Sequence, residues 1–384
     1  MMNRRRHLLL ACTSLAMTSE LLLSRQAFAE RKTKSAAKQT AKPAGKTLAR
    51  ATANESGGDA AADALKDRLR FGWLGRSDVQ EFISDVASRN EIPRNWVELQ
   101  FKGLGVQPRA LALMNPPPPK PNEPVRKRSW ARYLSQHADT SRIQEGRAFM
   151  ETHRAVLEDV SRNSGVPAAV ITAILGVETK YGKITGRYPT LETLTTLAFE
   201  SPRRADFFKR ELETLLLMGY DGVINLREAK GSFAGALGYP QFMPSSWQNF
   251  AIGYQHPRQA DLLNNPHDAI ASIGNFLKRH GWRANTPTHI AAEVPRGLDA
   301  KPFVAPKLEP IHTVSELEAA GIRQRTNRLH ASTRASLIDL PEEDDTVQYW
   351  IAAHNFFVVT QYNRSFMYAA AVLTLAEHFA DPVS

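Results

Sequence analysis

The chain has 384 residues, of which 42% are hydrophobic and 23% are charged, with a formal net charge of +10 at pH 7. This composition is typical of a globular protein that is long enough to bury a sizeable core. Residues 1–50 hold eleven Lys and Arg against two Glu, so +9 of the charge lies there and +1 remains for the rest. The nearly neutral body argues against a nucleic-acid-binding protein, which needs a basic face on its folded domain.

The N-terminus has the three parts of a secretory signal. Residues 4–6 are all Arg, residues 8–17 form an apolar stretch, and Ala27-Phe28-Ala29 is a small-residue cleavage site. We therefore expect residues 1–29 to be a signal peptide for the Sec route or, given Arg5-Arg6, the twin-arginine route. The alternative is an anchor helix, but a span needs ~20 apolar residues, and Glu20 and Arg25 interrupt the run.

The only cysteine, Cys12, bears on the compartment. Leu-Leu-Ala-Cys at residues 9–12 resembles a lipoprotein cleavage box, so an outer-membrane lipoprotein is the alternative to the periplasmic protein that we expect. Cleavage after Ala29 leaves no cysteine and hence no disulfide. Residues 30–64 have almost no large apolar side chains, which predicts a disordered basic linker. This linker is either a solvated spacer or a segment that binds anionic wall polymers or lipid head groups.

Helical patterns dominate residues 65–283. Ser77 is the expected cap of a helix with Val79, Phe82, Ile83 and Val86 on one face, and a second helix begins near Pro93. Residues 115–121 include five Pro and predict an extended connector. Further helices are expected around residues 139–162, 167–181, 190–199, 202–218 and 266–280.

The pattern changes at residue 284. Short strands are expected at residues 289–294, 346–352 and 356–361, with a small helix over 314–320 and a last helix over 363–379. The sequence therefore predicts a mainly α (α+β) fold. Its parts are a helical core over residues 65–283, a small α/β lobe over 284–361, and a C-terminal helix over 362–384 that returns to the core.

Glu178 closes an apolar helical stripe. Ile171, Ile174 and Leu175 lie seven, four and three residues before it, on the same helix face. Burial disfavours the charged form of an acid and raises its pKa. A carboxylic acid that stays protonated near neutral pH is what cleavage of a glycosidic bond needs. The alternative is a Glu at a helix end that bonds a nearby Arg or Lys180.

The loop over residues 230–246 has the composition of a sugar-binding segment. It holds three Gly, two Pro, and four side chains that are aromatic or Met. Glycine permits close approach of the backbone to a ligand, and Ser232 and Gln241 offer hydrogen bonds to sugar hydroxyls or an acetamido group. The alternative is a tight turn that packs against the core.

Several motifs together resemble one enzyme family. Gly-Val-Glu-Thr-Lys-Tyr-Gly at residues 176–182, the loop over 230–246, and the segments 201–208, 130–133 and 360–365 resemble lytic murein transglycosylases of the membrane-bound B type. The resemblance implies a lysozyme-like helical core with an added small lobe. It also implies cleavage of the β-1,4 bond between N-acetylmuramic acid and N-acetylglucosamine, with a 1,6-anhydro product. Glu178 matches the single glutamate that makes both proton transfers.

The same resemblance suggests which side chains contact the substrate. Ser232 and Gln241 match loop positions near the cleaved bond, and Arg203 and Arg204 match a basic pair that points at the substrate, with helix-surface ion pairs as the alternative. Positions that match the cleft or would line it are Tyr133, Tyr362, Asn363, Tyr368, Phe242 and Met243.

Two departures from the family pattern matter. Some relatives carry a calcium loop of alternating Asp and Asn, but residues 253–261 here lack such regular oxygen ligands, so we expect no metal. Pro240 stands where Gly is more usual. The resemblance implies no cofactor, a monomer, and peptidoglycan glycan strands as the partner, with cell-wall synthesis or divisome proteins as further candidates.

Two rival functions remain open from the residues. A hydrolase of lysozyme type needs a second positioned carboxylate, for which Glu192, Glu200, Asp206, Glu211 and Glu213 are available. A non-catalytic peptidoglycan-binding protein needs no working acid.

Overall fold

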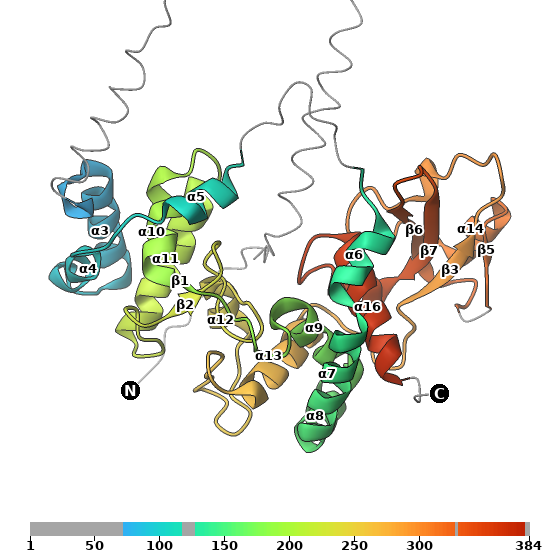
Figure 1. Cartoon of the computed structure of the whole chain (residues 1–384), viewed down its shortest axis with the longest axis horizontal. Coiled ribbons are helices and arrows are strands. Elements are labelled where there is room, and N and C mark those ends of the chain that lie inside the picture. Colours follow the sequence, from blue (N-terminus) through green and yellow to red (C-terminus); the bar gives the residue numbers. More distant parts are fainter. Residues whose placement is uncertain (1–71, 117–126, 327–328, 381–384) are drawn as a thin grey trace, which may run out of the picture.

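The computed structural model describes residues 72–116, 127–326 and 329–380. The predicted signal peptide, the predicted linker and Cys12 lie outside these ranges. Along the longest axis the molecule runs from α3 (Ser77–Asn90) and α4 (Arg94–Phe101) at one end to a β-sheet at the other (Figure 1). Between them lie α9 (Ala168–Thr179) and α16 (Phe366–Ala380). The described part is mainly helical, with 14 α-helices and a small sheet, which confirms the predicted fold class.

The N-terminal helices pack on a pair of longer helices. The elements are η1 (Trp73–Gly75), α3 (Ser77–Asn90), α4 (Arg94–Phe101) and α5 (Pro108–Met114), with α10 (Thr190–Glu200) and α11 (Ala205–Tyr220). α3 buries the predicted face of Val79, Phe82, Ile83 and Val86. The prediction that Ser77 caps this helix is wrong. Arg76 occupies the N-cap, and its guanidinium forms an ion pair with Asp78 in the first turn.

Carboxylates of α10 and α11 attach the N-terminal helices. Glu200 pairs with Arg76, and Glu213 accepts a hydrogen bond from the Asn90 amide at 2.8 Å. Glu192 accepts from the Gly105 backbone at 3.2 Å and from the Gln107 side chain. Three of the acids available for a hydrolase mechanism are therefore engaged in holding helices together.

A helix predicted over residues 139–162 is two helices, α7 (Thr140–Thr152) and α8 (Arg154–Ser164). The break is at His153, whose Nδ1 lies 3.2 Å from His267 Nε2 of α13 (Pro266–Arg279). Because the apolar repeat continues across the break, periodicity alone does not detect it. No single helix of the described ranges has the length and apolar composition of a membrane span; α8 and α9 (Ala168–Thr179) have them only as a pair, across a 112° bend.

α9 is the central helix. Every residue from Val170 to Gly176 is buried, as expected of a helix that is apolar all round. It contacts α7, α8 and α13, and α16 (Phe366–Ala380) lies beside it (Figure 1). The short helix α12 (Pro244–Phe250), which was not predicted, contacts both α11 and α13.

The β-containing part has its own small hydrophobic cluster. Its antiparallel sheet has the order β4-β6-β7-β3-β5, and α14 (Val314–Ala319) packs near β4 and β6. The strands are β3 (His289–Glu293), β4 (His312–Thr313), β5 (Arg323–Gln324), β6 (Arg334–Pro341) and β7 (Val347–Ala353). Nothing in the structure tests where the predicted lobe begins and ends.

One predicted strand is wrong. Residues 354–359 form the helix α15 (His354–Val359), where a strand over residues 356–361 was expected. Asn355 and the four residues after it are all buried. A short apolar run that is buried on every side shows no alternation, so its composition of Phe and Val suggested a strand.

The tip of the β6–β7 hairpin caps α6 (Trp130–His137). The Glu342 carboxylate accepts hydrogen bonds from the Ala131 backbone at 3.1 Å and from the Ser129 hydroxyl at 2.9 Å. Trp130 packs edge-on against Trp350 of β7 at 5.9 Å. The sheet therefore holds the N-terminal end of α6, where a carboxylate is favoured by the helix dipole.

We predict that Glu342→Ala lowers the free energy of unfolding by about 1–2 kcal/mol, because it removes a charged acceptor from a helix N-terminus. Glu343→Ala is the control. It removes only the exposed ion pair with Arg132, and such pairs contribute roughly 0–1 kcal/mol. Chemical unfolding of both variants measures the difference. Equal losses would show that Glu342 does not cap α6.

Candidate active site

Glu178 lies in the last turn of α9 and is partly exposed. Burial among protein atoms raises its pKa from the ordinary 4.5 to about 7. The Tyr368 hydroxyl donates a hydrogen bond of 2.6 Å to Glu178 Oε1, which opposes that rise but does not cancel it. Among the described residues no charged group contributes to the shift. Glu178 is therefore a desolvated acid without an ion-pair partner in this part of the chain.

Three tyrosines surround this acid. Tyr133 comes from α6, Tyr362 follows α15, and Tyr368 belongs to α16. Burial raises the pKa of each hydroxyl, and the charge of Glu178 raises it further. Tyr362 and Tyr368 are stacked, with ring centroids 6.4 Å apart. All three hydroxyls therefore stay protonated; that of Tyr368 donates to Glu178, and that of Tyr362 donates to the Pro240 carbonyl.

A sharp backbone turn follows Glu178. Lys180, Tyr181 and Gly182 have φ values of 50°, 59° and 88°. A Cβ at Gly182 would lie 1.9 Å from the Tyr239 ring, so only glycine fits there. Thr179 Oγ1 donates to the Tyr239 carbonyl at 3.0 Å. The end of α9 is thus locked to the loop over residues 230–246.

That loop begins with β2 (Lys230–Gly231), which pairs with β1 (Tyr188–Pro189). The Ser232 hydroxyl accepts hydrogen bonds from the backbone of Ala234 and Ala236, at 3.3 and 3.0 Å. Its own proton has no acceptor in the described ranges. Ser232 can therefore still donate one hydrogen bond to a ligand.

Gln241 is held in an unusual backbone conformation, with φ of 50°. Its side-chain nitrogen donates to the carbonyls of Thr185 and Gly238, each at 2.9 Å. Both amide hydrogens are thus used, and the amide oxygen has no bond to any described residue. Gln241 can therefore offer a ligand an acceptor but not a donor.

A buried acid that sequence analysis considered only as the second carboxylate of a hydrolase supports this loop. Glu211 of α11 is 3% exposed and accepts hydrogen bonds from the Ser245 backbone at 2.9 Å and its hydroxyl at 2.7 Å. Burial raises its pKa. It lies three residues after Phe208 and four before Leu215, which places it on the apolar face of the helix, and this signal could have identified it.

Some expected substrate contacts are buried. Phe242 and Met243, which were expected to line the cleft, are 2% and 4% exposed. Phe242 contacts Phe276 and Tyr362 at 5.7 and 5.9 Å. Tyr362 and Asn363 are buried as well, and the Tyr362 hydroxyl donates to the Pro240 carbonyl. Tyr133 is only partly buried.

Arg203 and Arg204 precede α11 and do not lie on it, because the helix predicted from residue 202 begins at Ala205. Arg203 is exposed. Arg204 has a φ of 63°, and its guanidinium lies over the Phe207 ring at 4.4 Å from the centroid. Both arginines therefore lie at the N-terminal end of α11, with Arg204 as its N-cap residue.

A buried acid forms hydrogen bonds near both ends of the segment over residues 253–261. The Asp268 carboxylate accepts from the backbone of Tyr254 and of Asp261, each at 2.8 Å. Across the described ranges, no group of three or more His, Cys, Asp or Glu is arranged to hold a metal ion.

Comparison with known proteins places this chain in a family. The profile of the transglycosylase SLT domain matches residues 75–377. Membrane-bound lytic murein transglycosylase B of Escherichia coli (strain K12) is 33% identical over 316 residues, or 79% of this chain and 82% of that protein.

Solved structures agree with this placement. Soluble lytic transglycosylase SltB1 from Pseudomonas aeruginosa matches with a TM-score of 0.72 and 31% identity, over 79% of this chain and 98% of that one. SltB3 from the same organism, in complex with NAG-anhNAM-pentapeptide, matches with a TM-score of 0.68 and 26% identity, over 78% of each chain. The helical core with its small sheet is the lysozyme-like fold of these enzymes. The chain is an enzyme that belongs to the lytic murein transglycosylase family, as its motifs indicated.

Proposed function

We propose that this enzyme cleaves the β-1,4 bond between N-acetylmuramic acid and N-acetylglucosamine in peptidoglycan and leaves a 1,6-anhydro-N-acetylmuramic end. The observation that carries the proposal is the environment of Glu178. It is a desolvated acid with a pKa of about 7, and no charged neighbour in the described ranges contributes to that value. One such acid can give a proton and take one back near neutral pH.

The reaction has two steps that balance without water. In the first, protonated Glu178 donates its proton to the glucosamine O4 as the bond from O4 to the muramyl C1 breaks. In the second, the Glu178 carboxylate takes the proton of the muramyl C6 hydroxyl while O6 bonds to C1. Because the nucleophile belongs to the substrate, no second carboxylate must hold a water molecule.

Tyr368 has a part in both steps. Its hydrogen bond to Oε1 stabilises the carboxylate that forms when the proton leaves. It also fixes one carboxyl oxygen and leaves Oε2 for the exchange of the proton. Tyr133 of α6 is proposed to donate a hydrogen bond to the substrate.

The loop supplies a donor and an acceptor for an acetamido group. The Ser232 hydroxyl suits the acetamido carbonyl, and the free oxygen of Gln241 suits its N–H. Arg203 and Arg204 are proposed to contact the substrate through its acidic groups, since guanidinium groups bind carboxylates well. The bound NAG-anhNAM-pentapeptide of SltB3 supports an anhydro product in this family.

The hydrolase alternative has less support. Glu192, Glu200 and Glu213 bind the N-terminal helices, and Glu211 binds Ser245. None of these carboxylates contributes to the pKa of Glu178, as a partner in hydrolysis would.

We also propose that the enzyme acts in the periplasm, where its substrate is found. The N-terminal signal pattern supports export, and the relative from Escherichia coli is named membrane-bound. A soluble form released at Ala29 is the main proposal, and a lipid anchor at Cys12 is the alternative.

The first test is the mass of the products. Purified sacculi digested with the wild-type enzyme should release anhydro-muropeptides, each lighter by one water than the product of hydrolysis. Glu178→Gln should lower the rate by about 10³-fold or more, since it can neither give nor take the proton. Glu98→Gln, at a surface ion pair with Arg94, is the matched control and should be fully active. Hydrated products, or an active Glu178→Gln, would refute the mechanism.

The second test is the pH profile of Tyr368→Phe. The lost hydrogen bond favoured ionised Glu178, so its pKa should rise above about 7. The alkaline limb of the rate profile should therefore move to higher pH, together with a lower maximal rate. A limb that stays in place would mean that another group titrates there.

The third test needs no substrate. Between pH 4.5 and about 7 the folded enzyme keeps the Glu178 proton while the unfolded chain loses it. Glu178 thus stabilises the fold most below pH 4.5, and this contribution is lost as the pH rises through about 7. Relative to wild type, Glu178→Gln should gain up to about 3 kcal/mol of stability across that range, since one pKa unit corresponds to ~1.4 kcal/mol. Chemical unfolding at several pH values measures the gain; a constant difference would indicate an ordinary exposed glutamate.

A further inference from the structure

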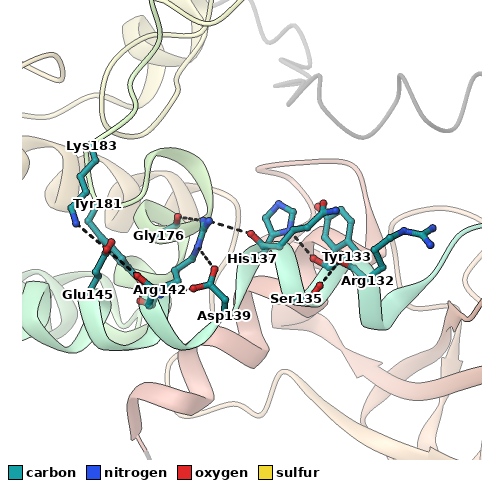
Figure 2. A network of polar contacts seen from close by, with 12 residues as sticks. Arg132, Tyr133, Ser135, His137, Asp139, Arg142, Glu145, Gly176, Tyr181 and Lys183 are labelled. Atoms are coloured by element: carbon teal, nitrogen blue, oxygen red, sulfur yellow. Dashed lines mark hydrogen bonds and ion pairs between the residues drawn. The ribbon is translucent and has the colours of Figure 1, made fainter.

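A buried guanidinium connects two helix ends of the site. Arg142, in the first turn of α7, is 7% exposed. Its Nη1 donates to the Gly176 carbonyl at 2.6 Å (Figure 2). Its Nη2 donates to the Gln136 carbonyl at 3.1 Å. Gly176 lies in the last turn of α9, and Gln136 lies in the last turn of α6.

Each of these helices carries one side chain of the site. Glu178 is two residues beyond Gly176, and Tyr133 is three residues before Gln136. The C-terminal ends of helices carry partial negative charge and free carbonyls, so a cation between two of them is favoured. The Arg142 bridge therefore fixes the acid and the tyrosine relative to each other.

The guanidinium is not held by a close ion pair. The nearest carboxylate oxygen, Asp139 Oδ2, is 3.9 Å from Nε, and Nε has no hydrogen-bond partner among the described residues. Glu145, on the same helix, pairs with Lys183 at 3.0 Å (Figure 2). His137 is also close, and both burial and the charge of Arg142 keep its pKa low. A buried cation with incomplete pairing destabilises a fold, which argues for a role beyond packing.

Tyr181 closes the same junction from the other side. Its hydroxyl donates to the Arg142 carbonyl at 2.7 Å, and its ring stacks on Phe149 at 5.6 Å. A Cβ at Gly176 would lie 2.6 Å from this hydroxyl, so the tyrosine lies directly on the α9 backbone. Arg142 and Tyr181 together hold the last turn of α9 against α7.

We propose that Arg142 is a positioning residue of the enzyme. Its hydrogen bonds to the Gly176 and Gln136 carbonyls set the position of Glu178 relative to Tyr133 and keep water away from Glu178. The inference rests on the proposed role of Glu178 as the acid. Arg142 itself touches no reacting atom.

The test compares Arg142→Lys and Arg142→Met with Tyr181→Phe. Lysine keeps the charge but lacks the planar fork that reaches both carbonyls. A misplaced acid should lower kcat by about 10- to 100-fold, with a smaller change in KM. Water that enters at the loosened turn should lower the pKa of Glu178, so the alkaline limb should move to lower pH. This direction is opposite to that expected for Tyr368→Phe.

Arg162→Met, at an exposed ion pair on α8, is the matched control and should keep the wild-type profile. Should Arg142→Met fail to fold, Arg142→Lys and Tyr181→Phe carry the test. Variants that lose thermal stability but keep kcat and the alkaline limb of wild type would overturn the proposal and leave Arg142 a packing role.

A measurement without substrate separates this inference from the proposed reaction. The change in stability that Glu178→Gln causes, followed across pH, reports the pKa of the acid. This change should shrink when Glu178→Gln is made in the Arg142→Lys background. If it does not shrink, Arg142 does not control the surroundings of Glu178. If it shrinks while the sacculus products are hydrated, the positioning role stands and the transglycosylase mechanism fails.

Discussion

The site depends on the desolvation of one carboxyl group at the end of an apolar helix. Burial raises the pKa of Glu178, and the hydrogen bond from Tyr368 opposes this rise. Without the bond burial would raise the pKa further, and without burial the bond would lower it, so the value of about 7 is the net result of the two. The buried end of α9 and the Tyr368 hydroxyl together set this balance.

Two further buried ionisable groups hold main-chain segments of the site and form no hydrogen bond to Glu178. Glu211 binds the start of α12 and so fixes the loop that carries Ser232 and Gln241, while Arg142 binds the end of α9. Both bond to backbone groups, so each fixes a stretch of main chain. Such buried groups destabilise a fold unless they are fully bonded, and the Nε of Arg142, which has no partner among the described residues, is a remaining cost.

The sequence predicted long periodic elements well and short ones poorly. α9 and α16 have continuous apolar patterns, whereas α5, α6 and α12 are only seven or eight residues long and were missed. Tertiary contacts stabilise α6 and α12, since Glu342 accepts a hydrogen bond from the first turn of α6 and Glu211 from the first turn of α12. β6 was missed because both of its faces are mostly buried, which removes the alternation of a strand. Within the site, motifs identified Glu178, Ser232 and Gln241. No sequence pattern pointed to Arg142, because it bonds to the backbone carbonyl of Gly176, 34 residues away.

A lone acid with a pKa near 7 suits a reaction that returns the proton. At neutral pH such a group is present in both forms in similar amounts, so neither the donation nor the uptake of the proton is strongly disfavoured. A second carboxylate close by would repel the charged form and raise the pKa of Glu178 further, which would leave little of the base. Within the described ranges no second carboxylate contributes to the pKa of Glu178. This fits a reaction in which the substrate supplies the nucleophile better than one in which the enzyme must activate a water molecule.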